Sequence, residues 1–116
     1  MSTPGTCAFC EIVAGDAAAV FVARWTHAVA IEPRGPVTDG HILVIPNKHV
    51  ADFTEDEDVT AQTARYASRL GRELGASANL ITSKGAPATQ SVFHLHWHLV
   101  PRRPGDRLLL PWGGQR

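Results

Sequence analysis

Three histidines, His94, His96 and His98, stand at alternate positions late in the chain. Side chains alternate between the two faces of a β-strand, so a strand over residues 92–100 would place all three imidazoles on one face. The positions between and beside them are bulky and apolar: Phe93, Leu95, Trp97 and Leu99. A rise of about 3.3 Å per residue would separate neighbouring imidazoles by about 6–7 Å. We therefore expect a strand that packs one face on the core and surrounds a small anionic group with the other.

Imidazole suits chemistry at phosphorus because its pKa lies near neutrality. A neutral ring can attack a phosphorus atom, and a protonated ring can donate hydrogen bonds to phosphate oxygens. Two other interpretations remain open at this point. The three rings can form a partly exposed polar face, or some of them can bind zinc, which a His-x-His pair on a strand is able to do.

Cys7 and Cys10 form a Cys-x-x-Cys pair near the start of the chain. In a reducing compartment such a pair more often binds a metal or does redox work than forms a structural disulfide. A single pair supplies only half of a zinc site, so two unlinked buried thiols are the alternative.

The bulk properties set limits on partners and location. The chain has 116 residues and a formal net charge of zero, which suits one domain over residues 1–116 and gives no electrostatic reason to expect nucleic acid as a partner. No apolar run approaches the roughly 20 residues that cross a bilayer, and residues 1–6 do not resemble a signal peptide. We expect a cytoplasmic protein without a membrane partner, with a flexible N-terminus over 1–6 and an irregular tail over 104–116.

Hydrophobic patterning predicts strands separated by one long helix. The expected strands cover residues 20–23, 28–32, 41–45, 78–82 and 92–100, with a helical turn over 10–14, a loop over 33–40 and a helix over 55–74. This order predicts an α+β fold with an antiparallel sheet.

The long helix carries signals at both ends. Thr54 and Glu57 form a capping-box pattern at its start, and Gly75 is suited to end it. The apolar face is expected to contain Val59, Tyr66, Leu70 and Leu74.

Four segments together resemble one known family. They are His94-Leu95-His96-Trp97-His98-Leu99-Val100, its lead-in Gln90-Ser91-Val92-Phe93, the earlier strand Gly40-His41-Ile42-Leu43-Val44-Ile45-Pro46, and the opening Cys7-Ala8-Phe9-Cys10-Glu11-Ile12-Val13-Ala14-Gly15. In this order, over about residues 7–103, they resemble the histidine triad (HIT) family. The resemblance is to its bacterial, Hint-like branch of nucleotide hydrolases and transferases with an N-terminal Cys-x-x-Cys zinc motif.

The resemblance implies a fold and an activity. The implied fold has about five antiparallel strands, one long helix and a short N-terminal helix, usually in a homodimer. The implied activity is cleavage at the α-phosphorus of purine nucleotide phosphoramidates, esters or dinucleoside polyphosphates through a nucleotidyl-histidine intermediate. Two alternatives stay open: a nucleotide-binding or scaffold protein with little catalysis, and a metal-dependent hydrolase that uses the triad as ligands.

By position, the resemblance assigns catalytic roles to three histidines. His96 would be the nucleophile, and His98 and His41 would line the α-phosphate pocket. Ser91 and the backbone around Gln90 would contact phosphate oxygens or the leaving group.

Three positions depart from the family pattern. Ser83 stands where many relatives carry Asn or Gln, and Thr89 stands where a Gly usually precedes the Gln-Ser pair. Pro33 stands where many members place a ribose-binding Asp, so the neighbouring Glu32 is the candidate for the ribose hydroxyls. These departures favour the alternative of binding with little catalysis.

The resemblance also completes the zinc site. It implies that His49 and His94 join Cys7 and Cys10, and two thiolates with two imidazoles suit tetrahedral zinc. Four protein ligands leave no open position, so the expected zinc is structural and ties the N-terminus to the histidine segment.

Overall fold

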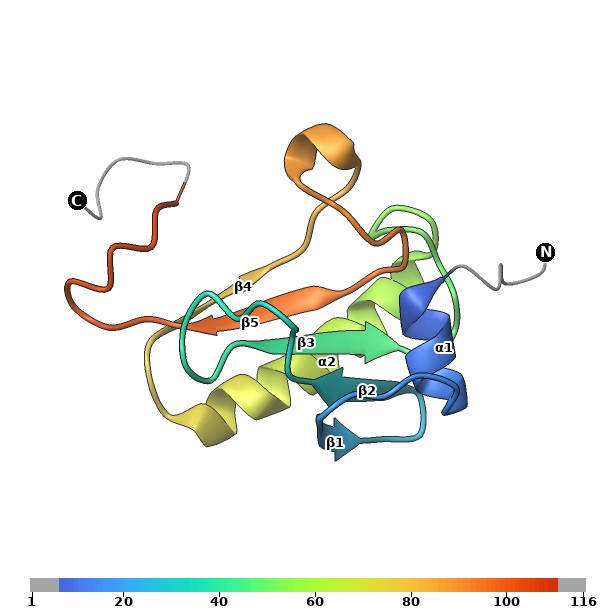
Figure 1. The fold of residues 1–116 in the computed structure, drawn as a ribbon, viewed down its shortest axis with the longest axis horizontal. Coiled ribbons are helices and arrows are strands. Elements are labelled where there is room, and N and C mark those ends of the chain that lie inside the picture. The colour runs from blue at the N-terminus through green and yellow to red at the C-terminus, as the bar shows by residue number, and fades with distance from the viewer. Residues whose placement is uncertain (1–6, 111–116) are drawn as a thin grey trace.

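The computed structural model describes residues 7–110, which form a sheet with a helix on each face (Figure 1). The expected flexible N-terminus, 1–6, and the end of the expected tail, 111–116, lie outside the described residues. The elements in chain order are α1 (Ala8–Ala14), β1 (Phe21–Arg24), β2 (Ala28–Ile31), β3 (Ile42–Pro46), α2 (Glu57–Leu74), β4 (Ala78–Ile81), the single-turn 3₁₀ helix η1 (Ala86–Ala88) and β5 (Trp97–Pro101).

The five strands form one antiparallel sheet in the order β1-β2-β3-β5-β4. This confirms the α+β fold predicted from the sequence, with one long helix and a short N-terminal helix. The last strand, β5, lies between β3 and β4, so its side chains are flanked on both sides by paired strands. The loop from β4 to β5, which carries η1, projects away from the sheet (Figure 1).

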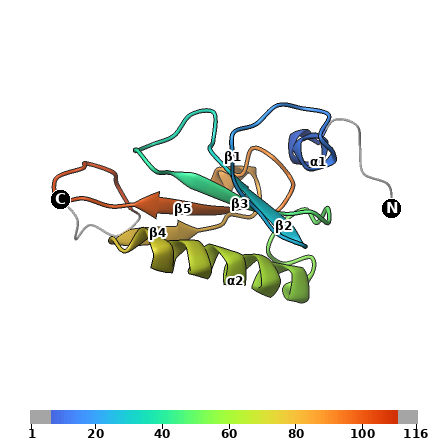
Figure 2. The same cartoon turned by 90° about the horizontal axis from the view of Figure 1, so that it is seen from below.

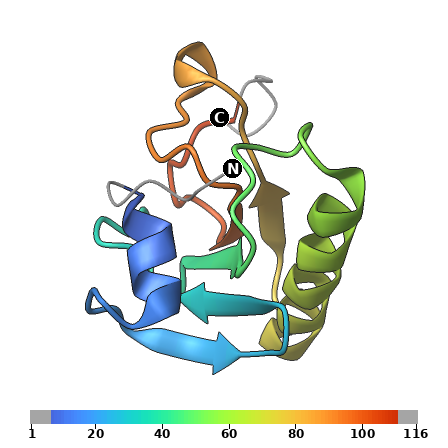
Figure 3. The same ribbon diagram turned by 90° about the vertical axis from the view of Figure 1, so that its right-hand side faces the viewer.

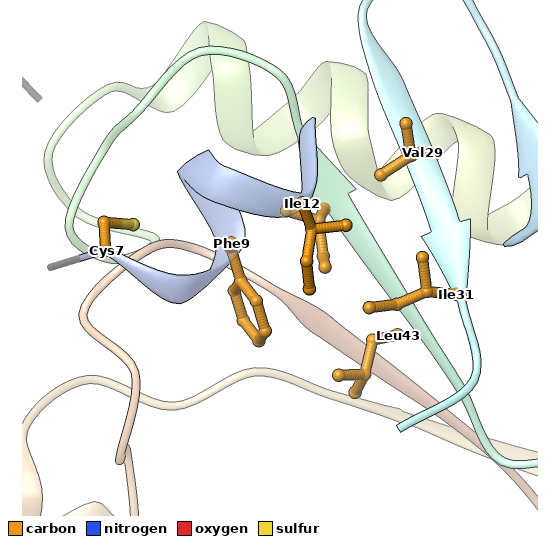
Figure 4. Packing of buried hydrophobic residues seen from close by; sticks show 7 residues of the cluster. Cys7, Phe9, Ile12, Val29, Ile31 and Leu43 are labelled. Atoms are coloured by element: carbon orange, nitrogen blue, oxygen red, sulfur yellow. The ribbon is translucent and has the colours of Figure 1, made fainter. Parts of the chain in front are cut away.

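The two helices cover opposite faces of the sheet (Figures 2 and 3). Alternation along the central strands divides the core accordingly. On the α1 side Phe9 and Ile12 pack against Val29, Ile31, Leu43 and Ile45. Figure 4 shows the side chains of Ile12, Ile31 and Leu43 pointing toward one another. On the α2 side Ala67 and Leu70 pack against Ala30, Val44 and Leu99. His98 alternates with Leu99 along β5, and its ring therefore lies on the α1 side.

The long helix begins at Glu57 rather than at the predicted residue 55. Its N-cap is Asp56, whose side chain accepts hydrogen bonds from the amides of Asp58 and Val59 at 3.0 and 3.1 Å. The predicted capping box is wrong, because the Thr54 hydroxyl donates to Asp52 Oδ1 at 2.6 Å and is not available to the helix. An ionised carboxylate at this position also complements the helix dipole.

The buried face of α2 differs in part from the prediction. The helix buries Thr63, Ala67 and Leu70, and Tyr66 packs beside them. Leu74 is 37% exposed because it is the last helical residue, just before Gly75 takes a φ of 67°. Small residues at the centre of the face let the helix lie close to the sheet. Within residues 7–110 no helix has both the length and the apolar character needed to cross a membrane.

The N-terminal helix starts two residues earlier than predicted. The Cys7 sulfur caps it by accepting from the Cys10 amide at 3.3 Å. Gly15 ends it with a φ of 84°, a left-handed conformation that suits glycine at the end of a helix. One turn of helix therefore sets the two cysteines of the Cys-x-x-Cys pair beside each other.

Candidate active site and metal centre

The histidine segment is only partly a strand. Pairing in β5 begins at Trp97 and includes His98, so the predicted strand over 92–100 is wrong for its first five residues. Before Trp97 the chain leaves the sheet: the Leu95 amide donates to Val50 O at 2.8 Å, and Thr82 Oγ1 donates to His96 O at 2.7 Å. The expectation that all three imidazoles line one strand face is therefore also wrong.

The apolar residues that alternate with the histidines differ in burial between the irregular segment and β5. Leu95 and Leu99 are 1% and 4% exposed, and Trp97 packs against the core on the α2 side. Phe93 is 53% exposed, which contradicts its predicted place in the core. It lies in the irregular segment, where strand alternation does not apply.

The ring of His96 has a defined proton position. Its Nδ1 lies 2.8 Å from the carbonyl oxygen of His94, and a carbonyl can only accept, so Nδ1 carries the hydrogen. The other nitrogen, Nε2, then has a free lone pair. Burial lowers the pKa of His96, which keeps the ring neutral. The phenyl ring of Phe9 lies edge-to-face with this imidazole, with a centroid distance of 5.0 Å.

His98 and His41 form a pair beside His96. His41 Nε2 lies 3.0 Å from His98 Nδ1, and the ring centroids of His96 and His98 are 5.0 Å apart. Burial, and then the proximity of His96 and His41, lowers the pKa of His98 to about 4. Burial also lowers the pKa of His41. The structure thus brings the three expected catalytic histidines together, each with a lowered pKa that favours the neutral ring.

Sequence reasoning missed the main-chain amide of Val37, which donates to His41 Nδ1 at 3.2 Å. The side chain of Val37 gives no signal of this, because the contact uses only the backbone. The loop that carries it, at residues 33–40, was predicted only as a connection.

Two of the expected substrate-binding residues are adjacent but differ in accessibility. Ser91 is exposed, whereas Gln90 is 4% exposed. The Gln90 side chain accepts from the Gly85 amide at 2.8 Å and donates to Ala51 O at 2.7 Å and Val92 O at 3.2 Å. This side chain braces the loop after η1, so only the backbone and Ser91 remain available to a ligand.

The residues at or next to the three departures from the family pattern lie in different surroundings. Ser83 is half-buried between β4 and η1, and Glu32 is exposed directly after β2. Thr89 has a φ of 73°, a left-handed conformation that glycine adopts without strain. This accounts physically for a glycine preference at the position, and Thr89 occupies it at a conformational cost.

The four expected zinc ligands form one cluster. Ligand atoms of Cys7, Cys10, His49 and His94 all lie within 4.8 Å of one another. The sulfur–Nδ1 distances are 3.2–3.5 Å and the His49–His94 Nδ1 separation is 3.1 Å. Zinc bonds of about 2.3 Å to sulfur and 2.0–2.1 Å to nitrogen, at tetrahedral angles, separate ligand atoms by about 3.3–3.8 Å. The cluster therefore fits a zinc ion with little adjustment.

The surroundings of His94 prepare it as a ligand. Its Nε2 donates to Pro46 O at 2.9 Å, which leaves the Nδ1 lone pair directed at the cluster. The side chain is fully buried, and burial lowers its pKa to about 4. A neutral imidazole with a fixed tautomer is the form that binds a metal ion.

Comparison with known proteins agrees with this geometry, because residues 14–105 match the family model of the HIT domain. The chain belongs to the HIT domain family. A zinc-bound histidine triad family protein from Mycobacterium smegmatis is 40% identical, with a TM-score of 0.82 over 90% of this chain and 80% of that one. A HIT family hydrolase from Clostridium thermocellum is 28% identical, with a TM-score of 0.81 over 93% of this chain and all of the other. The adenosine 5'-monophosphoramidase of Schizosaccharomyces pombe is 33% identical over 84% of this chain and 74% of its own length.

Proposed function

We propose that this HIT protein is a nucleotide hydrolase or transferase that cleaves at the α-phosphorus of purine nucleotide phosphoramidates, esters or dinucleoside polyphosphates. The observation that carries the proposal is the hydrogen bond from His96 Nδ1 to His94 O. It fixes the tautomer of a half-buried ring and leaves Nε2 as a nucleophile beside the His98 and His41 pair.

The proposed reaction has two displacements. His96 Nε2 attacks the α-phosphorus, a nitrogen–phosphorus bond forms, and the bond from phosphorus to the leaving group breaks, with the leaving group taking a proton from solvent. Water then attacks the same phosphorus and gives a proton to solvent, the nitrogen–phosphorus bond breaks, and the nucleoside monophosphate leaves a neutral His96 behind. Imidazole suits both steps because it is a good nucleophile and a good leaving group.

The other residues are assigned to binding. His98 and His41 would line the α-phosphate pocket, and a donor from His98 aimed at the phosphate oxygens would stabilise charge in the transition state. Ser91 is exposed next to the histidine segment and would contact the phosphate or the leaving group together with the backbone at Gln90. Ser83 and Glu32 are proposed, respectively, for the leaving group and the ribose.

Zinc is assigned a structural role in this proposal. Cys7, Cys10, His49 and His94 would hold it, and four protein ligands leave no position for a substrate. The metal would join α1 to the segment before β5, and α1 in turn carries Phe9 against the His96 ring. A cytoplasmic location and a homodimeric assembly remain predictions.

The decisive variant is His96→Ala, with His27→Ala as the matched control because His27 is an exposed histidine outside the site. We expect the first to abolish turnover of adenosine phosphoramidate and diadenosine polyphosphates and the second to retain it. Mass spectrometry of wild-type protein quenched in denaturant at alkaline pH, where a nitrogen–phosphorus bond survives, should find one nucleotidyl group attached to the peptide that contains His96. Undiminished turnover by His96→Ala would contradict the proposal, and tight nucleotide binding without turnover by the wild-type protein would favour a binding or scaffold role.

A further inference from the structure

A main-chain amide contacts the His41 ring on the side away from His98. The Val37 N–H donates to His41 Nδ1 at 3.2 Å. A ring nitrogen that accepts a hydrogen bond carries no hydrogen itself. The single hydrogen of a neutral His41 must therefore be on Nε2.

The position of the hydrogen on His41 also determines the tautomer of His98. His41 Nε2 lies 3.0 Å from His98 Nδ1, so Nε2 donates and His98 Nδ1 accepts. A neutral His98 then carries its hydrogen on Nε2, the one ring nitrogen left for a ligand. One backbone donor thus orients the hydrogens of two successive imidazoles in the same direction. Burial lowers the pKa of both rings, which is consistent with neutral forms at neutral pH.

The loop that presents the amide is held at several points. The His41 amide donates to Thr38 O at 3.2 Å, and the Arg103 guanidinium donates to Thr38 Oγ1 at 2.9 Å. Gly40 has a φ of +83°, and a Cβ at this position would lie 3.2 Å from Pro101 Cγ. The loop is therefore seated against the end of β5, and the Val37 amide has a fixed direction.

We propose that the main-chain amide of Val37 is a positioning group of the active site, which sets the His41 and His98 tautomers so that His98 presents a donor, not a lone pair, to the substrate phosphate. The role of that donor rests on the proposed function, whereas the hydrogen positions do not. With the opposite tautomers His98 would present a lone pair, which would repel an anionic oxygen instead of stabilising it.

The test reads the hydrogen positions directly. Two-dimensional ¹H–¹⁵N spectra of ¹⁵N-histidine-labelled, zinc-loaded protein distinguish protonated from unprotonated ring nitrogens, with His41→Gln and His98→Asn providing assignments. We expect the wild-type protein to carry hydrogen on Nε2 of both His41 and His98. Hydrogen on Nδ1 of either ring would overturn the proposal without any variant at position 37.

Two changes at position 37 then remove the donor. Val37→Pro lacks the N–H, and incorporation of the α-hydroxy analogue of valine replaces the N–H by an ester oxygen without adding a ring. Either change should shift the His41 and His98 nitrogens toward a mixture of tautomers and lower kcat by up to about 100-fold, the scale of losing one preorganised donor. Val37→Ala keeps the amide and should keep the wild-type nitrogen shifts.

The outcomes separate this inference from the proposed function. Wild-type nitrogen shifts in both the Val37→Pro and ester proteins would overturn the role of the amide. The expected nitrogen shifts in a wild-type protein that shows no turnover and no His96 adduct would support the hydrogen arrangement and overturn the proposed function. If Val37→Pro fails to fold, the ester protein and the wild-type spectra still decide.

Discussion

Acidification should destabilise the protein through His98 over a defined pH range. The pKa of this ring falls from 6.5 in the unfolded chain to about 4 in the folded protein. Between these two values the unfolded chain binds a proton that the folded protein does not, so the free energy of unfolding falls as the pH falls. The contribution is fully present above about pH 7 and is lost progressively as the pH falls toward 4.

The size of the effect follows from the same two values. One pKa unit corresponds to about 1.4 kcal/mol, and a two-state titration between pH 7 and pH 5 then gives a loss of about 2 kcal/mol. His98 is partly accessible, and solvent screening reduces such terms. We therefore expect His98 to account for a loss of about 1–2 kcal/mol over this interval.

The measurement is urea unfolding of the wild-type and His98→Asn proteins at pH 7 and pH 5, followed by tryptophan fluorescence. Asn is the control side chain because its Oδ1 can accept from His41 Nε2 yet does not titrate. Any zinc held by the cysteine–histidine cluster would be lost from both proteins at low pH, so the quantity to compare is the difference between their free energies of unfolding. That difference should shrink by about 1–2 kcal/mol at pH 5. A difference that is the same at both pH values would refute the assignment of a lowered pKa to a half-buried, neutral His98.

Three further substitutions test the metal centre, the loop over residues 33–40 and the hydrogen bonds of the Gln90 side chain. Cys10→Ala removes one of four ligands, so protein purified without chelators should lose its zinc and at least about 3 kcal/mol of stability; full zinc content by elemental analysis would contradict the assigned ligand set. Gly40→Ala forces a side chain into a left-handed conformation 3.2 Å from a proline Cγ and should cost about 1–3 kcal/mol in thermal unfolding, whereas Gly35→Ala, with nothing within 4 Å, should be nearly neutral. Gln90→Ala removes three hydrogen bonds to the backbone of the half-buried residues Gly85, Ala51 and Val92 and should cost about 2–4 kcal/mol, while Ser91→Ala should lower turnover with little change in stability; equal stability of these two variants would contradict the bracing role.

The fold was largely predictable because the sheet strands are short apolar runs bounded by turn residues. The helix start was not, since Thr54 and Asp56 both have side chains that can cap a helix. The choice depends on Asp52, which accepts from the Thr54 hydroxyl and leaves Asp56 as the cap. A local pattern cannot report such a competition.

The histidine segment shows a second limit of sequence patterns. Alternation from 92 to 100 predicts a continuous strand, but Leu95 donates to Val50 in the loop after β3 and not to a neighbouring strand. The alternating pattern of histidines and apolar residues before Trp97 has a different cause from strand pairing. Leu95 is buried in the core, whereas the His94 side chain is part of the cysteine–histidine cluster. The ligand set itself was predictable only through family resemblance, because residues 7, 10, 49 and 94 are widely separated in the chain. The Val37 amide was not predictable from side-chain types at all.

The spacing of the metal ligands has a consequence for the protein during its synthesis. Cys7 and Cys10 leave the ribosome first, His49 follows, and His94 emerges only when most of the chain has been made. A zinc ion taken up early by the two thiolates would lack half of its protein ligands and would remain open to exchange with other cellular thiols. Its coordination becomes complete only when the segment containing His96 has been translated, so a fully ligated metal marks a chain in which the residues proposed for the chemistry are already present.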